Sequence, residues 1–332
     1  MLGPFAHPKG YVCHRAVSPV KVDGDLTDAA WQGVPWTDTF VDIEGDKQPR
    51  PRFRTRAKMV WDDEALYIAA ELEDPHIWAT LSEHDAVIFQ DNDFEVFLDP
   101  DGDNHLYAEL ELNATNTTWD LLLSKPYKDQ GRAINNWEIK GLKTGVKLDG
   151  TINNPADRDT GWTLEICWPW SGLKELAITN IPPQDGDRWR INFSRVQWDL
   201  EVAEGKYRKV KGKPEYNWVW SPQGVIDMHR PERWGYLQFS TAKPGKAEFS
   251  PDPDWEARDL LHRVYYAQHV HQKATGKYAT AIGDLQVKDK AASRISLETT
   301  RRWFEASVLI PGEKGTEPRR ITISQDSQIV KE

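Results

Sequence analysis

The sequence predicts a mainly β protein, with a β-sandwich over residues 11–240 and a small α+β domain over residues 250–332. Short segments in which apolar and polar residues alternate recur through the first part of the chain, as they do in half-buried strands. A single long helical period follows, and alternating segments return after it. Three prolines in residues 240–254 lie between the two patterns and indicate a linker. The 332 residues would suffice for one large sandwich or for two domains, and the pattern favours two.

Composition argues against some partners and favours others. The 52 acidic residues outnumber the 42 basic ones, and a net charge of −10 argues against a nucleic-acid backbone or an anionic membrane as the main partner. The 16 Trp, 10 Tyr and 10 Phe residues exceed what a sandwich core usually needs. A surplus ring can stack on the C–H face of a sugar, although any single ring is more often part of the core. A neutral partner such as an oligo- or polysaccharide fits this composition.

Several other features are missing from the sequence. No run is apolar enough to span a membrane, and the opening MLGPFAHPKG lacks the basic and apolar regions of a signal peptide, so a leader is expected to be absent from this chain. No glycine-rich nucleotide loop, zinc-ligand spacing or nucleophile elbow occurs, and neither nucleotide nor haem is expected. Cys13 and Cys167 are too few for a disulfide framework, though the count still allows one bridge.

The first predicted elements are ordinary sandwich strands. Residues 11–45 predict an entry strand, an Asp-Gly turn and a short helical turn that ends at Trp31. Residues 46–56 are basic and contain proline, as in a surface loop, and residues 57–74 alternate as a hairpin. The long loop over residues 74–93 is rich in His, Trp and acidic residues, and loops of this length are often binding elements.

The central predicted element is a hairpin over residues 87–113 with one apolar and one acidic face. Because side chains alternate along a strand, two sets are expected to face the core: Phe94, Val96 and Leu98 in the first strand, and Leu106, Ala108, Leu110 and Leu112 in the second. The opposite face then carries Asp93, Glu95, Glu109, Glu111 and Asn113, with Phe97 and Tyr107 among them. Such carboxylates must be solvated, be paired with a base or a metal ion, or contact a ligand.

Later strands complete the sandwich. Residues 119–123 and 161–170 predict strands, the second ending at Pro169. In the strand over residues 187–199 the inward positions change from apolar to Arg195 and Gln197, as when a strand leaves the core for a site or for solvent. A loop containing Met228, His229 and Glu232 precedes the closing strand over residues 234–239.

The C-terminal residues predict a helix that begins at Trp255 and stops at Gly276, followed by three strands. This order resembles the globular part of type IV pilin-like proteins. The N-terminal membrane helix of pilins is not present, so we expect packing onto the sandwich rather than assembly into a fibre.

Five segments occur in an order that resembles the family 9 carbohydrate-binding modules, over about residues 15–240. They are VDGDLTDAAW, VWDDEALYIAAELEDP, QDNDFEVFLDPDG, GWTLEICWPW and RPERWGYLQF. The resemblance implies an antiparallel, jelly-roll-like β-sandwich that binds sugar, often with structural calcium. It also implies an exported protein, periplasmic or extracellular.

The resemblance further implies where a sugar would bind. The family holds the sugar between two aromatic rings, and Phe89 falls at one ring position and Glu95 at a binding glutamate. The second ring position falls near Met228, and Glu111 stands where the family has an arginine. Losing a ring and exchanging Arg for Glu would change the specificity. The full set of candidate binding residues is Phe89, Asp93, Glu95, Glu111, Asn113, Trp198, Met228, His229 and Glu232.

Three functions stay open at this point. The first is an exported sugar-binding protein. The second is a glycan-active enzyme, with Glu95, Glu111 and His229 as candidate catalytic groups. The third is an interaction or scaffold protein, suggested by the C-terminal domain.

Calcium is the expected metal ion, because it prefers several hard oxygen ligands. Its ligands would be Asp25 and Asp74 by the resemblance, or Asp99, Asp101 and Asp103 by their alternate spacing in a turn. Acidic turn residues also cap backbone amides, which explains the same pattern without a metal.

Overall fold

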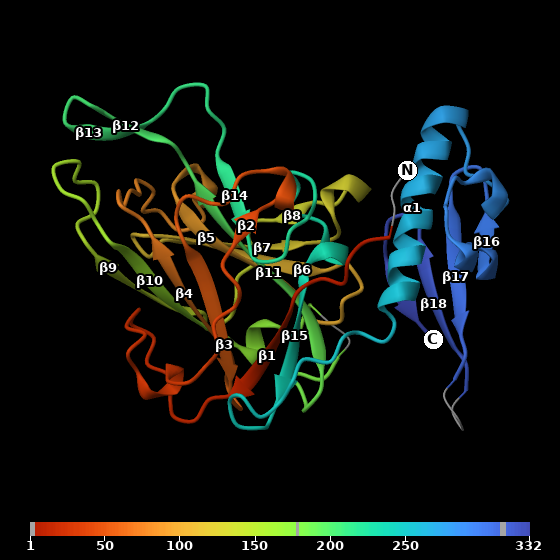
Figure 1. Ribbon diagram of the computed structural model, residues 1–332, viewed down its shortest axis with the longest axis horizontal. Helices are drawn as coiled ribbons and strands as arrows, with labels where there is room; N and C mark the ends of the chain where they lie inside the picture. The colour runs from red at the N-terminus through yellow and green to blue at the C-terminus, as the bar shows by residue number, and fades with distance from the viewer. Residues whose placement is uncertain (1–3, 177–178, 313–316) are drawn as a thin grey trace.

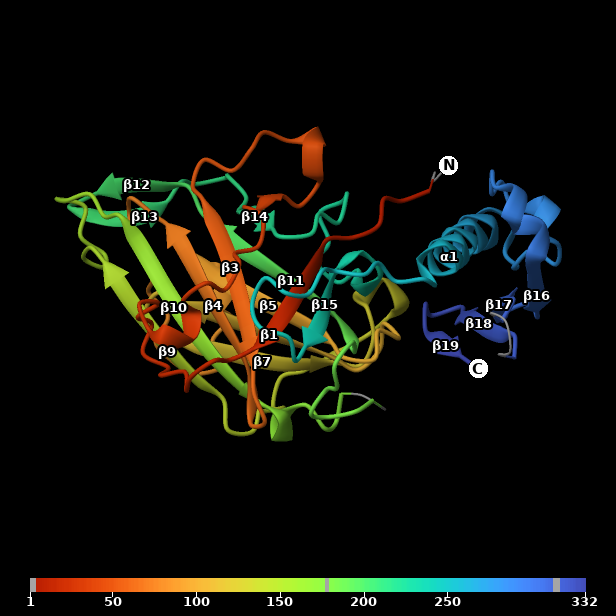
Figure 2. The same ribbon diagram turned by 60° about the horizontal axis from the view of Figure 1, so that its bottom comes forward.

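The computed structural model describes residues 4–176, 179–312 and 317–332. Figures 1 and 2 show a large curled β-sheet body and, beside it, a small region built from one helix and a sheet. The predicted fold class is therefore confirmed: the chain is mainly β, with a sandwich-like body and a small C-terminal α+β region.

Thirteen strands of the described chain form one continuous sheet that curls around its core. The central path runs β8-β7-β6-β5-β11-β15-β1-β3-β4-β10-β9, and β14 and β2 pair beside β11. Neighbouring strands are antiparallel except at β1, which runs parallel to both β15 and β3, so the expected antiparallel sheet is in part mixed. The bounds are β1 Gly10–Arg15, β2 Val41–Asp42, β3 Thr55–Trp61, β4 Ala65–Glu73, β5 Asp93–Asp99, β6 Tyr107–Asn113, β7 Thr118–Leu123, β8 Ala133–Ile134, β9 Lys143–Asp149, β10 Gly161–Pro169, β11 Arg188–Gln197, β14 Tyr216–Val219 and β15 Gly235–Ser240.

The described chain also contains smaller elements. A two-stranded hairpin of β12 (Leu200–Ala203) and β13 (Lys206–Lys209) follows β11 and was not expected from the sequence. Short 3-10 turns occupy Ala29–Trp31, Gly45–Lys47, Ile88–Gln90, Tyr127–Asp129, Trp170–Gly172, Pro231–Arg233, Ile282–Asp284 and Lys290–Arg294. The first of these is the predicted helical turn that ends at Trp31.

The central hairpin of β5 and β6 has the predicted alternation. Phe94, Val96 and Leu98 are fully buried in the main core. The prediction for Leu106 was wrong: this residue precedes β6, has a left-handed φ of 46° and is 45% exposed. The turn uses one more residue than expected, and the strand begins at Tyr107.

The polar end of β11 stays inside the protein. Arg195 is 1% exposed, and its guanidinium donates to the Gln197 side-chain oxygen, to Thr55 Oγ1 and to the carbonyl of Glu73. It also lies 3.4 Å from Asp74 Oδ2 in a buried ion pair. The change from apolar to polar residues therefore marks a buried polar network rather than an exit to solvent.

The C-terminal region consists of α1 (Trp255–Thr275) packed on a four-stranded antiparallel sheet. Its strands are β16 Ile295–Thr299, β17 Phe304–Ile310, β18 Arg319–Ser324 and β19 Ile329–Lys331. Gly276 caps the helix in a left-handed conformation, as predicted. Among the described residues, no helix is both long and apolar enough to cross a membrane.

This region rests on the turns of the body. The backbone N–H of Ile329 donates to the carbonyl of Asp103, and Asn104 Nδ2 donates to the carbonyl of Ser327. Cys13 and Cys167 are free and lie in different core clusters, so the bridge that the count allowed does not form.

Candidate functional site

A cavity of about 330 Å³ lies on the acidic face of the β5–β6 hairpin. One wall comes from the turn at Ile88–Gln90, another from the loop that precedes Pro231–Arg233. Five of the predicted binding residues line it together: Phe89, Glu95, Glu111, Met228 and His229. Alternation along β5 and β6 brings the carboxylates to this face, and the two loops close over its edge.

Three carboxyl groups form the floor of the cavity. Glu95 and Glu111 are direct cross-strand partners, and Glu109 lies opposite Phe97. Directly opposite residues in an antiparallel pair place their Cβ atoms about 4.5–5.5 Å apart, so these side chains are close neighbours. All three are buried: Glu95 and Glu109 are each 5% exposed, and Glu111 is 2% exposed.

Burial changes the protonation of these groups. Loss of solvation raises the pKa of Glu95 to about 7, with smaller effects from Ser194 and Glu215. Loss of solvation followed by repulsion from Glu95 raises the pKa of Glu109 and of Glu111 well above the ordinary range. At neutral pH Glu95 is therefore protonated in part, and burial favours the protonated form of Glu109 and Glu111, which can donate hydrogen bonds as well as accept them.

His229 faces the same floor. Its Nδ1 lies 2.9 Å from the hydroxyl of Tyr107, and its Nε2 lies 4.0 Å from Glu109 Oε2. Burial lowers the pKa of His229 to about 4, so the imidazole is neutral at physiological pH. Burial also raises the pKa of Tyr107, so its hydroxyl stays protonated and can donate a hydrogen bond to His229 Nδ1.

Two aromatic rings form a platform beside the carboxyl groups. Phe89 and Trp119 are both partly exposed, and their centroids lie 6.5 Å apart with planes inclined by 27°. Trp119 is the cross-strand partner of Glu111, which puts both side chains on the same face. Sequence reasoning missed Trp119 and also Tyr127, which lines the cavity and is 47% exposed.

Four other predicted residues lie outside the cavity lining. The Asn113 amide bonds to the Leu81 carbonyl, Asp91 and the Thr115 and Thr117 amides, which shape the following turn. Trp198 holds the Phe89 turn from behind, because its Nε1 donates to the Phe89 carbonyl at 2.9 Å. Glu232 is buried against Lys128 and Tyr266. Asp93 is fully buried next to Glu95.

Among the described residues, three groups of side chains lie close enough together to hold a cation. One consists of His84, Asp120 and Glu138, and the other two are wholly acidic. Oxygen atoms of Asp93, Glu95 and Glu111 lie within 4.8 Å of one another, and so do those of Asp99, Asp101 and Asp103. In the second cluster both Asp99 oxygens already accept backbone N–H groups, from Gly102 and Asn104. In the first, Asp93 Oδ2 is buried without a hydrogen-bond partner among the described residues, so this cluster fits a hard cation better.

The two aspartates that the resemblance suggested as calcium ligands contact basic residues instead. Asp25 lies 2.8 Å from Lys147, whose hydrogen bond lowers the pKa of Asp25 to about 2. Asp74 pairs with Arg195. Calcium binding by this pair stays a prediction.

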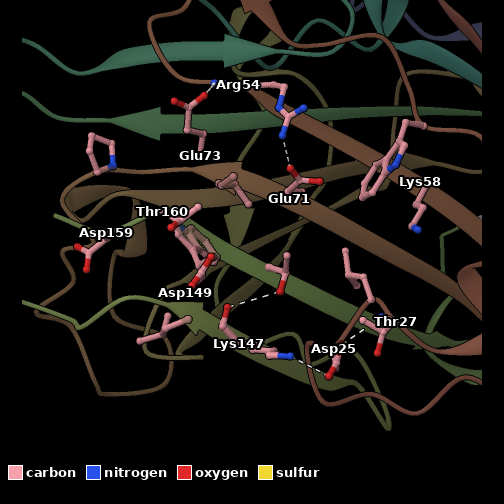
Figure 3. A pocket seen from close by; sticks show the side chains of 18 of the residues that line it. Asp25, Thr27, Arg54, Lys58, Glu71, Glu73, Lys147, Asp149, Asp159 and Thr160 are labelled. Atoms are coloured by element: carbon pink, nitrogen blue, oxygen red, sulfur yellow. Dashed lines mark hydrogen bonds and ion pairs between the residues drawn. The ribbon is translucent and has the colours of Figure 1, made fainter.

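A larger cavity, of about 890 Å³, lies over the outer face of β3, β4, β9 and β10. Figure 3 shows two ion pairs among its lining side chains, Asp25–Lys147 and Arg54–Glu71. None of the predicted sugar-binding residues lines this larger cavity, in contrast to the smaller one.

Comparison with known proteins agrees with this fold. Residues 22–188 match the family model described as carbohydrate family 9 binding domain-like. The chain belongs to this family. The matched residues of this family 9-like chain include β5, β6 and β7 with Phe89, Glu95 and Glu111, but they end before the loop that carries His229. No curated protein matches the chain.

Similar solved structures include a putative carbohydrate-binding protein from Bacteroides uniformis ATCC 8492. It is 16% identical, covers 70% of this chain and 100% of its own, and has a TM-score of 0.52. A family 9 carbohydrate-binding module from Caldicellulosiruptor kristjanssonii, solved with cellotriose and with glucose, is 16% identical with TM-scores of 0.45 and 0.47. It covers 73% of this chain and 100% of its own. At this identity the likeness to the Bacteroides structure concerns the fold.

Proposed function

We propose that this protein binds an oligo- or polysaccharide in the cavity between the Phe89 turn and the Met228–His229 loop. The observation that carries the proposal is the Phe89–Trp119 platform beside a floor of buried carboxyl groups. Rings stack on the apolar face of a sugar, while carboxyl groups and a neutral imidazole exchange hydrogen bonds with its hydroxyls. Family membership supports the same class of ligand.

The platform predicts stacking on one face of the sugar. A guest between two parallel rings needs about 7–8 Å between the planes, twice the optimal carbon–carbon separation. The Phe89 and Trp119 centroids are 6.5 Å apart, so the rings form a joint surface rather than opposite sides of a clamp. Met228 faces the cavity where the family would supply the second ring.

The cavity volume limits the ligand. At about 330 Å³ it lies at the lower end of the range of about 300–1,000 Å³ that is usual for small-molecule sites. It therefore accepts a short saccharide or one end or branch of a longer chain. An exported location belongs to this proposal, since a protein that binds free polysaccharide must meet it outside the cytoplasm.

Catalysis on a glycan is the second candidate. It is favoured by a carboxyl group with a pKa near 7 at Glu95 and by the Glu109–His229–Tyr107 arrangement. A scaffold role for the C-terminal region and its resemblance to pilin-like proteins stay predictions. Binding without turnover is preferred, because it requires only the platform and the floor.

A glycan array followed by isothermal titration would test binding. For a glycan that the wild type binds, Phe89→Ala and Trp119→Ala should each lose about 1 kcal/mol, roughly a fivefold rise in Kd. Because these rings touch, their combined effect should be less than the sum. Trp303→Ala, which removes a partly buried ring from the C-terminal region, is the matched control. Unchanged affinity in both cavity variants would exclude this site.

Glu111→Gln separates binding from catalysis. A binding protein should keep much of its affinity, because Gln retains hydrogen-bonding groups of the same size. An enzyme that uses this carboxyl group should keep its affinity and lose most product formation. Product analysis on each glycan that the array identifies decides between the two outcomes.

A further inference from the structure

A separate cavity lies where the C-terminal region meets the body, away from the proposed sugar site. It encloses about 270 Å³, and four basic side chains line it: Arg188, Arg190, Arg258 and Lys331. The first two come from the start of β11, the third from the first turn of α1 and the last from β19. Figure 1 shows the end of the chain beside the first turns of α1, facing the body.

Arg190 is the central feature of this cavity. It is 2% exposed, its guanidinium lies 4.0 Å from the centroid of the Tyr236 ring, and its Nε and Nη2 atoms both donate to the carbonyl of Pro231. Its Nη1 is buried and has no hydrogen-bond partner among the described residues, and the same holds for Arg188 Nε. A buried donor of a charged group that lacks an acceptor costs free energy. Two such donors lining one cavity leave hydrogen bonds that a bound acceptor could fill.

Three carboxylates line the cavity beside the basic groups: Asp101, Asp187 and Asp252. Asp187 accepts the Gln184 backbone N–H at 2.7 Å, and Asp101 accepts that of Asp103 at 3.3 Å. Asp252 accepts the Tyr236 hydroxyl at 2.9 Å and the Asp254 backbone N–H at 3.0 Å, and it lies 4.0 Å from Arg258 Nε. Lys331 pairs with Asp254, a carboxylate that also holds Arg319.

The basic groups also repel one another. Burial and then the charge of Arg258 lower the pKa of Lys331. Burial is likewise the main cause that lowers the pKa of Arg190, and Arg258 adds to it. An added negative charge would relieve this crowding.

We infer that this cavity binds one small oxyanion, which Arg190 Nη1 and Arg188 hold together with Arg258 and Lys331. The planar guanidinium matches the geometry of phosphate, sulfate and carboxylate oxygens, and hydrogen bonds between such charged groups are the strong ones. Because its ligands come from both the body and the C-terminal region, the anion stabilises their contact. The inference does not depend on sugar binding.

Isothermal titration and thermal unfolding of the full chain test this inference. Sodium phosphate, sodium sulfate and sodium D-glucuronate are compared with sodium chloride at the same ionic strength. The first two represent free oxyanions, and glucuronate represents the carboxylate of an acidic sugar. At least one of them should bind with a stoichiometry near one and raise the melting temperature more than chloride does.

Variants locate the site. Arg190→Gln should weaken binding about tenfold or more, since it removes a charged donor. Arg188→Gln and Lys331→Gln, at the less buried edge of the cavity, provide the same test if Arg190→Gln does not fold. Arg319→Gln is the control, because Arg319 is 52% exposed, pairs with Asp254 and lies outside the cavity lining. Equal effects of chloride and the oxyanions, no binding, or loss of binding in Arg319→Gln alone would each overturn the inference.

Discussion

His229 should make the stability of the protein fall in mild acid. Its imidazole lies in the wall of the proposed sugar cavity and is only 16% exposed, with Tyr107 on one nitrogen and Glu109 near the other. The perturbation we choose is His229→Gln, which removes the titrating group while keeping a side-chain acceptor for the Tyr107 hydroxyl.

The sign and size of the effect follow from the two pKa values. The ordinary histidine pKa is 6.5, and burial lowers that of His229 to about 4 in the folded protein. Between these values the unfolded chain binds more protons, so the stability contribution is complete above pH 6.5 and is lost as the pH falls through 4. This linkage gives a loss of about 2 kcal/mol at pH 5 and about 3 kcal/mol at pH 4.

Urea denaturation from pH 4 to pH 8 in the presence of a chelator measures the effect. Other groups titrate too, and the carboxyl groups with raised pKa values act in the opposite direction, so the informative quantity is the difference between wild type and His229→Gln. This difference should move in favour of the variant by about 2 kcal/mol between pH 7.5 and pH 5. The control is His271→Gln on α1, which measures how the loss of an imidazole elsewhere in the chain changes the pH dependence of the unfolding free energy. Parallel profiles for wild type and His229→Gln would refute the assignment of a buried neutral imidazole.

Three further predictions concern metal binding, domain organisation and the contact between the two regions. Calcium should raise the melting temperature above the value measured in chelator. Glu111→Gln should remove this shift if Asp93, Glu95 and Glu111 bind the ion, whereas Asp101→Asn should remove it if the turn at Asp99–Asp103 binds it. If calcium does not shift the melting temperature, neither cluster binds it. Trypsin should cut first after the exposed Lys246, in the segment without regular structure between Ser240 and Trp255, and earlier cuts within the body would contradict a division into two domains. Tyr265→Phe should cost about 1.5–3 kcal/mol of unfolding free energy, because its hydroxyl donates to the buried carboxylate of Asp129. Tyr278→Phe, whose hydroxyl has no hydrogen-bond partner in the described part of the chain, is the control, and equal costs would argue against the contact.

The sequence predicted the face of the central hairpin correctly because alternation along a strand is a local property. Once β5 and β6 are paired, Glu95 and Glu111 have to share a surface. Trp119 was missed because its place depends on register. The turn between β6 and β7 sets that register, and the Asn113 side chain organises it by accepting the Thr115 and Thr117 backbone N–H groups. Asn113 was predicted to bind sugar, and in the structure its side chain forms the hydrogen bonds that shape this turn.

The alternation of apolar and acidic residues also could not predict that the carboxyl groups are buried. Phe97 and Tyr107 interrupt the acidic face, and in the structure they join Ile43, Met228 and Trp234 in a second apolar cluster. That cluster covers the face that was expected to be acidic. The two large rings among the acidic residues were the sequence feature that indicated burial. The residues that pack on these rings, such as Ile43 and Trp234, come from distant parts of the sequence.

Two loops of the cavity wall, at residues 127–129 and 227–233, both form hydrogen bonds to α1. The turn at Tyr127–Asp129 directs Tyr127 toward the cavity and Asp129 toward Tyr265.

The loop at residues 227–233 likewise carries His229 into the cavity, and its Glu232 accepts a hydrogen bond from Tyr266. Lys128 joins the two loops, because its Nζ lies 3.3 Å from Glu232 Oε2. This explains why Glu232, a predicted sugar ligand, is buried away from the cavity. The C-terminal region thus holds the cavity wall in place without lining it, so a site on the family 9-like body depends on residues outside the family match.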